Sequence, residues 1–143
     1  MADEQLRIED EPSPTDVEAL NDSLYRHNAA IMGHADGRWL AIFVRDHARE
    51  IAAGLHGWTW GGTCFVQTLW IREDLRRKGL GARLLAAAEA EAIRRGCREL
   101  HLDTHSYQAP GFYRHLGYEQ IGELPGWPAC ADTTRIFFRK KLG

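Results

Sequence analysis

The chain has 143 residues, of which 44% are hydrophobic and 27% are charged, and its formal net charge is −2 at pH 7. This length and apolar content can bury a core, so we expect one domain over residues 1–143 rather than a disordered segment. The slightly acidic balance excludes a general nucleic-acid coat, which needs an excess of positive charge, so we expect no nucleic-acid partner.

The N-terminal third is predicted to contain a short strand and a helix. The stretch QLRIED, residues 5–10, alternates in polarity like a strand. Residues 14–16 carry helix-start signals, and the helix is expected to continue through Met32, before Gly33, Asp36 and Gly37 interrupt it.

Three strands are expected next. RWLAIFVRD (38–46), IAAGLHGWTW (51–60) and CFVQTLWI (64–71) are rich in aromatic and β-branched residues, and the segments HARE and GGT between them are short. Strands joined by short turns predict an antiparallel meander. We expect one of Trp58 and Trp60 to pack in the core.

The apolar period changes after this meander. Leu80 to Arg95 has the spacing of a helix, and Gly96 is placed to end it. The remaining chain predicts a strand in RELHLDT (98–104), a short helix in APGFYRHLG (109–117), a strand in YEQIGEL (118–124), a long loop in PGWPACAD (125–132) and a final strand in TTRIFFRKK (133–141). Strands around one long helix indicate an α+β or mixed α/β fold.

The cysteines and the N-terminal residues give information on the cellular location of the protein. Cys64, Cys97 and Cys130 are odd in number and form no C-x-x-C pair, so they predict neither a disulfide framework nor a zinc site. The first residues are acidic and lack the apolar segment of a signal peptide, and no apolar run is long enough to cross a bilayer. We therefore expect a cytoplasmic protein with reduced thiols and no membrane partner.

The segment LRRKGLGARLL, residues 75–85, places three basic residues and two glycines at the start of the long helix. A helix N-terminus has unsatisfied N–H groups and the positive end of the helix dipole, and glycine lets an anion approach them. Basic residues at this end are unfavourable on their own, so the arrangement favours a bound polyanion such as a diphosphate.

The segment can be compared with the known phosphate-binding motifs. Both the P-loop pattern and the G-x-G-x-x-G fingerprint are absent. What remains is R-x-x-G-x-G, with Arg76, Gly79 and Gly81, which by itself also fits a basic turn before a glycine-eased helix start.

A second segment lies downstream, SYQAPGFYRHLGY, residues 106–118. The two segments in this order and spacing resemble the GNAT superfamily of acyl-CoA-dependent N-acetyltransferases, along nearly the whole chain. The resemblance implies an α/β (α+β) GNAT-like fold, with a mixed, mostly antiparallel central sheet of about six to seven strands flanked by helices. Glu73, where the family often has proline, and Ser106, where asparagine is common, depart from the pattern; the second weakens a role for Ser106 in gripping the CoA arm.

The resemblance implies a set of residues that bind acetyl-CoA. The backbone of Leu69, Trp70 and Ile71 would pair with the pantetheine amides like an added strand. Arg77 or Lys78 either reaches the ribose phosphate or is solvated. The full cofactor set is Leu69, Trp70, Ile71, Arg76, Arg77, Lys78, Gly79, Leu80, Gly81, Ala82, Ser106 and Tyr113.

Tyr113 occupies the position at which the family places a tyrosine near the CoA sulfur. A phenol with an ordinary pKa of about 10 can donate a proton to a thiolate, so the resemblance implies a general acid. From the residues alone, Tyr113 also fits a packing aromatic beside Phe112.

The acceptor side is less defined. HLDTH places His101, Asp103 and His105 on one face of a strand, which fits either a metal triad or an ordinary polar face; we expect no metal. Within the resemblance, Asp103 or His105 would bind the amine or take its proton. The candidates for binding the acceptor are Tyr25, Asn28, Asp103, His105 and Trp127.

The expected activity is acetyl-CoA-dependent N-acetylation of a primary amine by direct attack in a ternary complex. The alternative is a module of the same fold that binds or senses acyl-CoA without turnover. The resemblance also allows a homodimer, and acetyl rather than a longer acyl group is its default.

Overall fold

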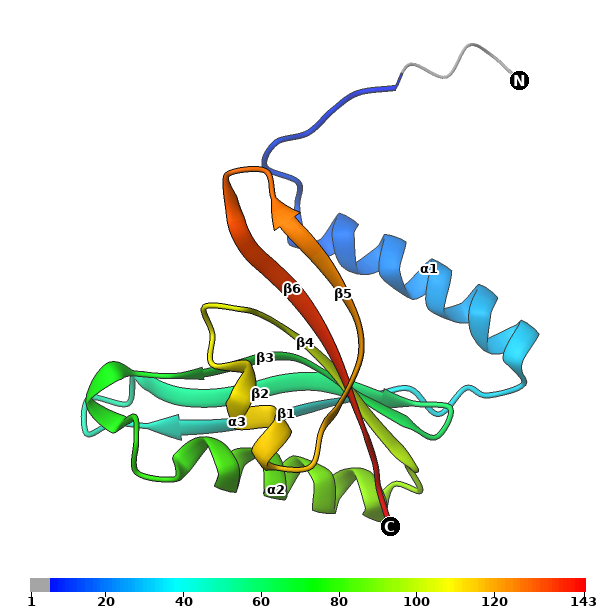
Figure 1. The fold of residues 1–143 in the computed structure, drawn as a ribbon. Helices are drawn as coiled ribbons and strands as arrows, with labels where there is room; N and C mark the ends of the chain where they lie inside the picture. Colours follow the sequence, from blue (N-terminus) through cyan, green and yellow to red (C-terminus); the bar gives the residue numbers. More distant parts are fainter. Residues whose placement is uncertain (1–5) are drawn as a thin grey trace, which may run out of the picture. The chain divides into compact units, whose positions relative to one another are not determined.

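The computed structural model describes residues 6–143 (Figure 1). By contacts they divide into two units, one ending at Ala35 and one from Asp36 to Gly143, and each is described by itself. The elements in chain order are α1 (Pro14–Met32), β1 (Arg38–Arg45), β2 (Ile51–Trp60), β3 (Thr63–Ile71), the 3₁₀ turn η1 (Glu73–Leu75), α2 (Leu80–Arg94), β4 (Glu99–His105), α3 (Pro110–His115), β5 (Glu119–Trp127) and β6 (Cys130–Lys141).

Helix α1 belongs to the first unit. Pro14 stands at its first position, where a missing N–H costs nothing, and Gly33 ends it in the left-handed conformation with φ 70°. The N–H groups of Gly33 and His34 both donate to the carbonyl of Ala29, at 2.9 and 3.2 Å. The predicted start and stop of this helix are confirmed.

No helix among the described residues is long and apolar enough to cross a membrane.

The second unit is built on one six-stranded sheet in the order β1-β2-β3-β4-β6-β5. Among its described strands, β3 and β4 are the parallel pair, and α2 forms the crossover that such a pair requires. The other neighbours are antiparallel, with β6 lying between β4 and β5. The predicted mixed, mostly antiparallel sheet is confirmed, with six strands.

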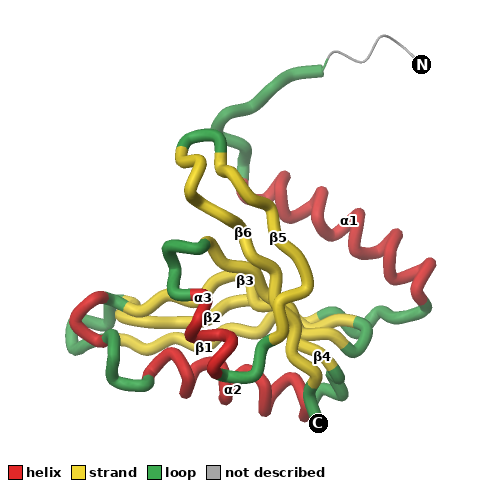
Figure 2. The backbone as a smooth tube through the Cα atoms, in the orientation of Figure 1, coloured by secondary structure: helices red, strands yellow, loops and turns green. Residues whose placement is uncertain are grey.

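The core lies on the face of the sheet that packs against α2 and α3. Figure 2 shows α2 running along the strands. Strand β4 alternates as predicted: Leu100 and Leu102 are buried, whereas His101 on the opposite face is half-buried. Phe138 of β6 and Leu85 of α2 are among the most completely buried side chains in the same cluster.

Polar contacts hold α2 to the sheet at two places. Near its C-terminus, the Arg95 guanidinium donates to the hydroxyl of Thr59 on β2 at 3.1 Å. In its middle, Glu89 accepts from the Tyr118 hydroxyl at 2.7 Å and from Lys140 Nζ at 3.0 Å. These contacts fix the orientation of α2, and so the direction in which its N-terminus points.

Two predicted segments are wrong. Residues 6–10 of the expected strand QLRIED form no strand, and Gln5 lies outside the described residues; alternation alone is not sufficient where no neighbouring strand accepts the backbone bonds. The predicted loop at 125–132 is instead the end of β5, a two-residue turn and the start of β6. Pro125 is tolerated because β5 is an edge strand. The pairing is irregular next to it, where the single residue Gly126 of β5 stands opposite residues 131–133 of β6.

Candidate functional site

Strands β3 and β4 diverge at their C-terminal ends. Their parallel pairing runs from Thr63 and Glu99 to Val66 and Leu102, although β3 continues to Ile71 and β4 to His105. A bulge at Gln67 interrupts the pairing of β3 with β2, which resumes at the next residue. Because bulges bend the strand that carries them, this one turns the end of β3 away from β4.

The predicted pantetheine residues lie on this diverging end. Leu69, Trp70 and Ile71 pair with β2 on one side, and no β3–β4 pair in residues 6–143 covers their other side. Arg76 Nε donates to the Ile71 carbonyl at 2.8 Å, so the protein itself occupies one of these backbone groups. The Leu69 side chain packs against the core, whereas the Trp70 side chain is exposed.

The predicted phosphate loop connects β3 to α2. After η1 the chain is extended at Arg76, turns left-handed at Arg77 with φ 60° and again at Gly79 with φ 76°, and enters α2 at Leu80. The N-cap is Gly79, which has no side chain to cap the first N–H groups, and the first turn contains no acidic residue. The side chains of Arg77 and Lys78 are exposed beside this helix end.

The two glycines of the motif serve different purposes. Gly79 adopts a left-handed conformation, and a Cβ there would meet no atom within 4 Å. Gly81 has an ordinary helical backbone, but a Cβ there would lie 3.1 Å from Phe112 Cζ and 3.2 Å from Ile71 Cδ1. Gly79 therefore permits the turn, and Gly81 permits α2 to pack closely against α3 and the end of β3.

Tyr113 lies on α3 and is buried, with 8% of its surface exposed. Its ring packs against those of Phe112, Tyr118 and Phe138, with centroid distances of 5.1, 5.9 and 5.7 Å. Burial, and to a smaller extent the charge of Asp103, raise the pKa of Tyr113 above its ordinary value. The phenol is therefore protonated at neutral pH, in a setting that agrees with both predicted roles, packing aromatic and general acid.

The end of β4 brings together two of the five acceptor candidates. The His105 ring stacks on Tyr107 at 5.3 Å with an interplanar angle of 3° and meets the edge of Trp127 at 4.9 Å. Its Nδ1 is buried without a hydrogen-bond partner in the part of the chain that the structure describes. Trp127 comes from the end of β5, so the hairpin brings it to β4. The sequence did not predict that Tyr107 contributes to this cluster, although it lies only two residues after His105.

Asp103 faces the same side of β4 but is already paired. Its Oδ2 accepts from Arg135 Nε at 2.8 Å. Arg135 was also missed, because this contact depends on the register of β4 against β6, which places Arg135 opposite His105. The other two acceptor candidates, Tyr25 and Asn28, lie on α1, in the first unit.

Ser106 continues the pairing of β4 with β6. Its N–H donates to the Thr134 carbonyl at 2.8 Å, and its hydroxyl oxygen accepts from the Thr134 N–H at 3.0 Å. His101, the third member of the metal alternative, has Nε2 2.9 Å from the Glu99 carboxylate. Within residues 6–143, no group of three or more His, Cys, Asp and Glu side chains could hold a metal ion.

Comparison with protein families and curated proteins identifies relatives of this chain. Residues 4–118 match the model of the acetyltransferase (GNAT) family. An acetyltransferase of Agrobacterium fabrum is 38% identical over 106 residues, which cover 74% of this chain and 77% of that protein. Blasticidin-S acetyltransferase of Streptomyces morookaense is 41% identical over 92 residues, which cover 62% of this chain and 65% of that protein.

Solved structures with the same fold include acetyltransferases. The crystal structure of an Agrobacterium tumefaciens protein described as an acetyltransferase superposes with a TM-score of 0.84, at 30% identity over 97% of this chain and all of that one. An aminoglycoside 6′-N-acetyltransferase solved with coenzyme A has a TM-score of 0.60 at 19% identity, covering 92% of this chain and 93% of that one, a likeness of fold alone. The match to the Agrobacterium structure confirms the predicted fold.

Proposed function

The chain belongs to the GNAT family of acetyltransferases, and on that premise we propose that it transfers an acetyl group from acetyl-CoA to a primary amine by direct attack in a ternary complex. One observation carries this proposal: the loop of residues 72–79 joins the end of β3 that β4 leaves unpaired to the glycine-capped N-terminus of α2. The first suits a diphosphate, and the second suits the amides of pantetheine. We also propose that residues 1–143 form one N-acetyltransferase domain.

The cofactor would lie between these two features. The N–H groups of Gly79, Leu80, Gly81 and Ala82 would donate to the diphosphate, and the exposed cations of residues 76–78 would add charge attraction. The backbone of Leu69 to Ile71 would hold the pantetheine arm. The Ser106 hydroxyl oxygen already accepts the Thr134 N–H, and the hydroxyl would donate its proton to a ligand.

The transfer forms one bond, breaks another and moves two protons. The amine nitrogen forms a bond to the thioester carbonyl carbon, the carbonyl oxygen carries negative charge, and the carbon–sulfur bond then breaks. Tyr113 would donate its proton to the departing thiolate, for which its raised pKa keeps it protonated. The proton lost by the amine would pass to a group on the acceptor side.

His105 is the better supported acceptor-side group. Asp103 is engaged by Arg135, whereas the buried Nδ1 of His105 has no partner among the described residues. A buried nitrogen without a hydrogen bond is unfavourable, and an acceptor group or a water placed by it would relieve that cost. We propose that His105 takes the proton, directly or through water, while Trp127 and Tyr107 contact the body of the acceptor. Tyr25 and Asn28 remain proposed acceptor contacts.

A transfer assay tests the function. The protein would be incubated with acetyl-CoA and a panel of primary amines, and release of free CoA thiol and acetylated product would be measured. Product with at least one amine supports the proposal. Binding of CoA without transfer to any amine would instead favour the sensing module. We further propose a cytoplasmic location, in keeping with the free buried thiols of Cys64 and Cys97, and leave a homodimer to be tested by size measurement.

A further inference from the structure

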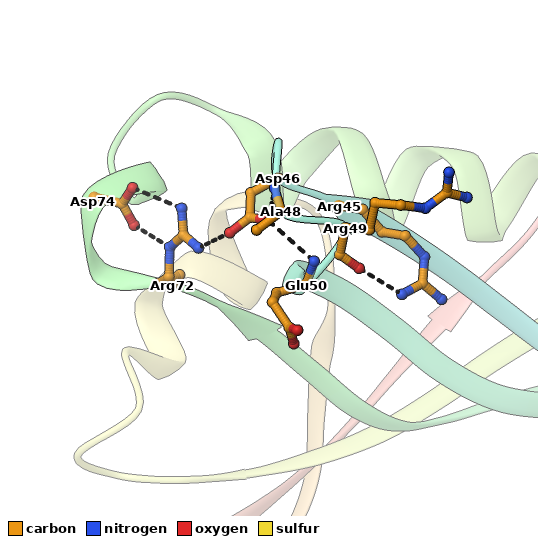
Figure 3. Close-up of polar contacts among 7 residues, drawn as sticks. All are labelled: Arg45, Asp46, Ala48, Arg49, Glu50, Arg72 and Asp74. Carbon is orange, nitrogen blue, oxygen red and sulfur yellow. Dashed lines mark hydrogen bonds and ion pairs between the residues drawn. The ribbon is translucent and has the colours of Figure 1, made fainter.

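Arg72 is the first residue after β3 and begins the phosphate loop. Its guanidinium is shared between two carboxylates: Nη1 donates to Asp46 Oδ2 at 2.7 Å, while Nε and Nη2 donate to the two oxygens of Asp74 at 2.7 and 3.1 Å (Figure 3). Asp46 follows β1 and Asp74 lies in η1, so one side chain joins the β1–β2 turn to the loop.

The Asp46 end of this bridge is rigid. Asp46 Oδ1 accepts the N–H groups of Ala48 and Glu50 at 2.9 and 3.0 Å, and so organises the β1–β2 turn with the same carboxylate that binds Arg72 (Figure 3). The Arg49 carbonyl in this turn also accepts from Arg45 at 3.2 Å. Arg72 is therefore attached to a turn whose conformation is already fixed by hydrogen bonds within the turn.

The other end of the bridge reaches into the loop. Asp74 is gripped by two parallel hydrogen bonds, a geometry that fixes direction as well as distance. The N–H of Leu75 donates to the Arg72 carbonyl at 2.9 Å, and Arg76 Nε donates to the Ile71 carbonyl at 2.8 Å. The path from β3 to Arg76 is thus set before the chain reaches the left-handed residues and the N-terminus of α2.

We propose that Arg72 is a positioning residue, which holds the phosphate loop against the β1–β2 turn so that the first N–H groups of α2 are preorganised for the diphosphate of CoA. This inference rests on the proposed function. We assign Arg72 to the bridge rather than to the phosphates, because its Nε, Nη1 and Nη2 each already donate to Asp46 or Asp74. Preorganisation of a binding loop improves affinity by lowering the ordering that the ligand must impose.

Asp46→Asn separates positioning from simple electrostatics. Asp46 accepts from Arg72 with one oxygen and from the turn N–H groups with the other, whereas a carboxamide has only one accepting oxygen. The variant therefore loses either the bond to Arg72 or the bonds that hold the turn, whichever way the amide is oriented. It also removes a negative charge, which by Coulomb attraction alone would leave the binding of polyanionic CoA unchanged or strengthen it. Positioning predicts the opposite sign, a weaker affinity.

The experiment is calorimetric titration of CoA into the full chain, the Asp46→Asn variant and a control. The control is Glu91→Gln, which removes a carboxylate paired with Arg94 and Arg95 at the far end of α2. We expect the Kd for CoA to rise about threefold to fivefold in Asp46→Asn, the effect of losing one exposed charged bridge, and to stay unchanged in the control.

Arg72→Lys provides a second variant, because lysine keeps the charge but cannot span two carboxylates in a fixed fork. It should weaken CoA binding to a similar extent, with little change in the melting temperature of either variant. Wild-type affinity in both Asp46→Asn and Arg72→Lys would overturn the positioning role. A wild-type chain that binds no CoA would instead refute the proposed function.

Discussion

Replacing Gly79 by alanine tests the geometry of the phosphate loop. Gly79 has φ 76° and ψ 6°, which is left-handed, and a Cβ added there meets no atom within 4 Å. The substitution therefore lowers stability through backbone strain and not through a steric clash with neighbouring atoms. Asparagine is the matched control, because it enters the left-handed region more readily than alanine.

The magnitude follows from this conformation. An L-residue in the left-handed region loses about 1–2 kcal/mol, so Gly79→Ala should lower the free energy of unfolding by about 1 kcal/mol or slightly more. For a chain of 143 residues this corresponds to a fall in melting temperature of about 3 °C. If the loop relaxes to an ordinary φ instead, the N–H groups of Leu80 and Gly81 turn away and the Kd for CoA rises.

Urea denaturation monitored by tryptophan fluorescence, with and without CoA, measures both effects. Saturating CoA at 100 times its Kd should stabilise the wild type by about 2.7 kcal/mol, and Gly79→Ala by less at the same CoA concentration. Without CoA, the free energy of unfolding of Gly79→Asn should lie between those of the wild type and Gly79→Ala. An alanine variant as stable as the wild type, or an asparagine variant no better than alanine, would refute the left-handed assignment.

Three further predictions follow from the site and from α2. Tyr113→Phe should lower kcat by about 10²-fold with little change in the KM for acetyl-CoA, and an unchanged kcat in steady-state assays would remove its acid role. His105→Ala should slow transfer at saturating acetyl-CoA by at least about tenfold while calorimetry shows unchanged CoA affinity; equal loss of both would contradict an acceptor-side role. The hydrogen bonds from Arg94 and Arg95 lower the pKa of Glu91 from 4.5 to about 2, so its stabilisation is complete above pH 4.5 and is lost as the pH falls toward 2. Wild-type melting temperature should then fall more steeply than that of Glu91→Gln across this range, and parallel curves would count against the ion pairs.

Features of the fold that depend on neighbouring residues could be predicted from the sequence. Pro14 and Gly33 mark the ends of α1, and the basic residues followed by Gly79 and Gly81 mark the start of α2, because capping and left-handed turns are decided within a few residues. The alternation of HLDTH likewise predicted which side of β4 faces the core, since side-chain direction has a period of two along a strand.

Features that depend on distant partners could not be read in this way. Pro125 and Gly126 indicate a loop locally, but the antiparallel pairing of β5 with β6 makes them part of an edge strand. The contact between Asp46 and Arg72 joins residues 26 positions apart, and that between Asp103 and Arg135 depends on strand register. The different purposes of Gly79 and Gly81 also emerge only from the packing of Phe112 and Ile71 around the second.

The backbone amide signals of α2 test the central claim most directly. In a ¹H–¹⁵N titration of the full chain with CoA, the N–H groups of Gly79, Leu80, Gly81 and Ala82 should show the largest shifts, because each would donate to the diphosphate. Binding of CoA that leaves these four signals in place, with the shifts concentrated elsewhere in the sheet, would contradict the proposed site.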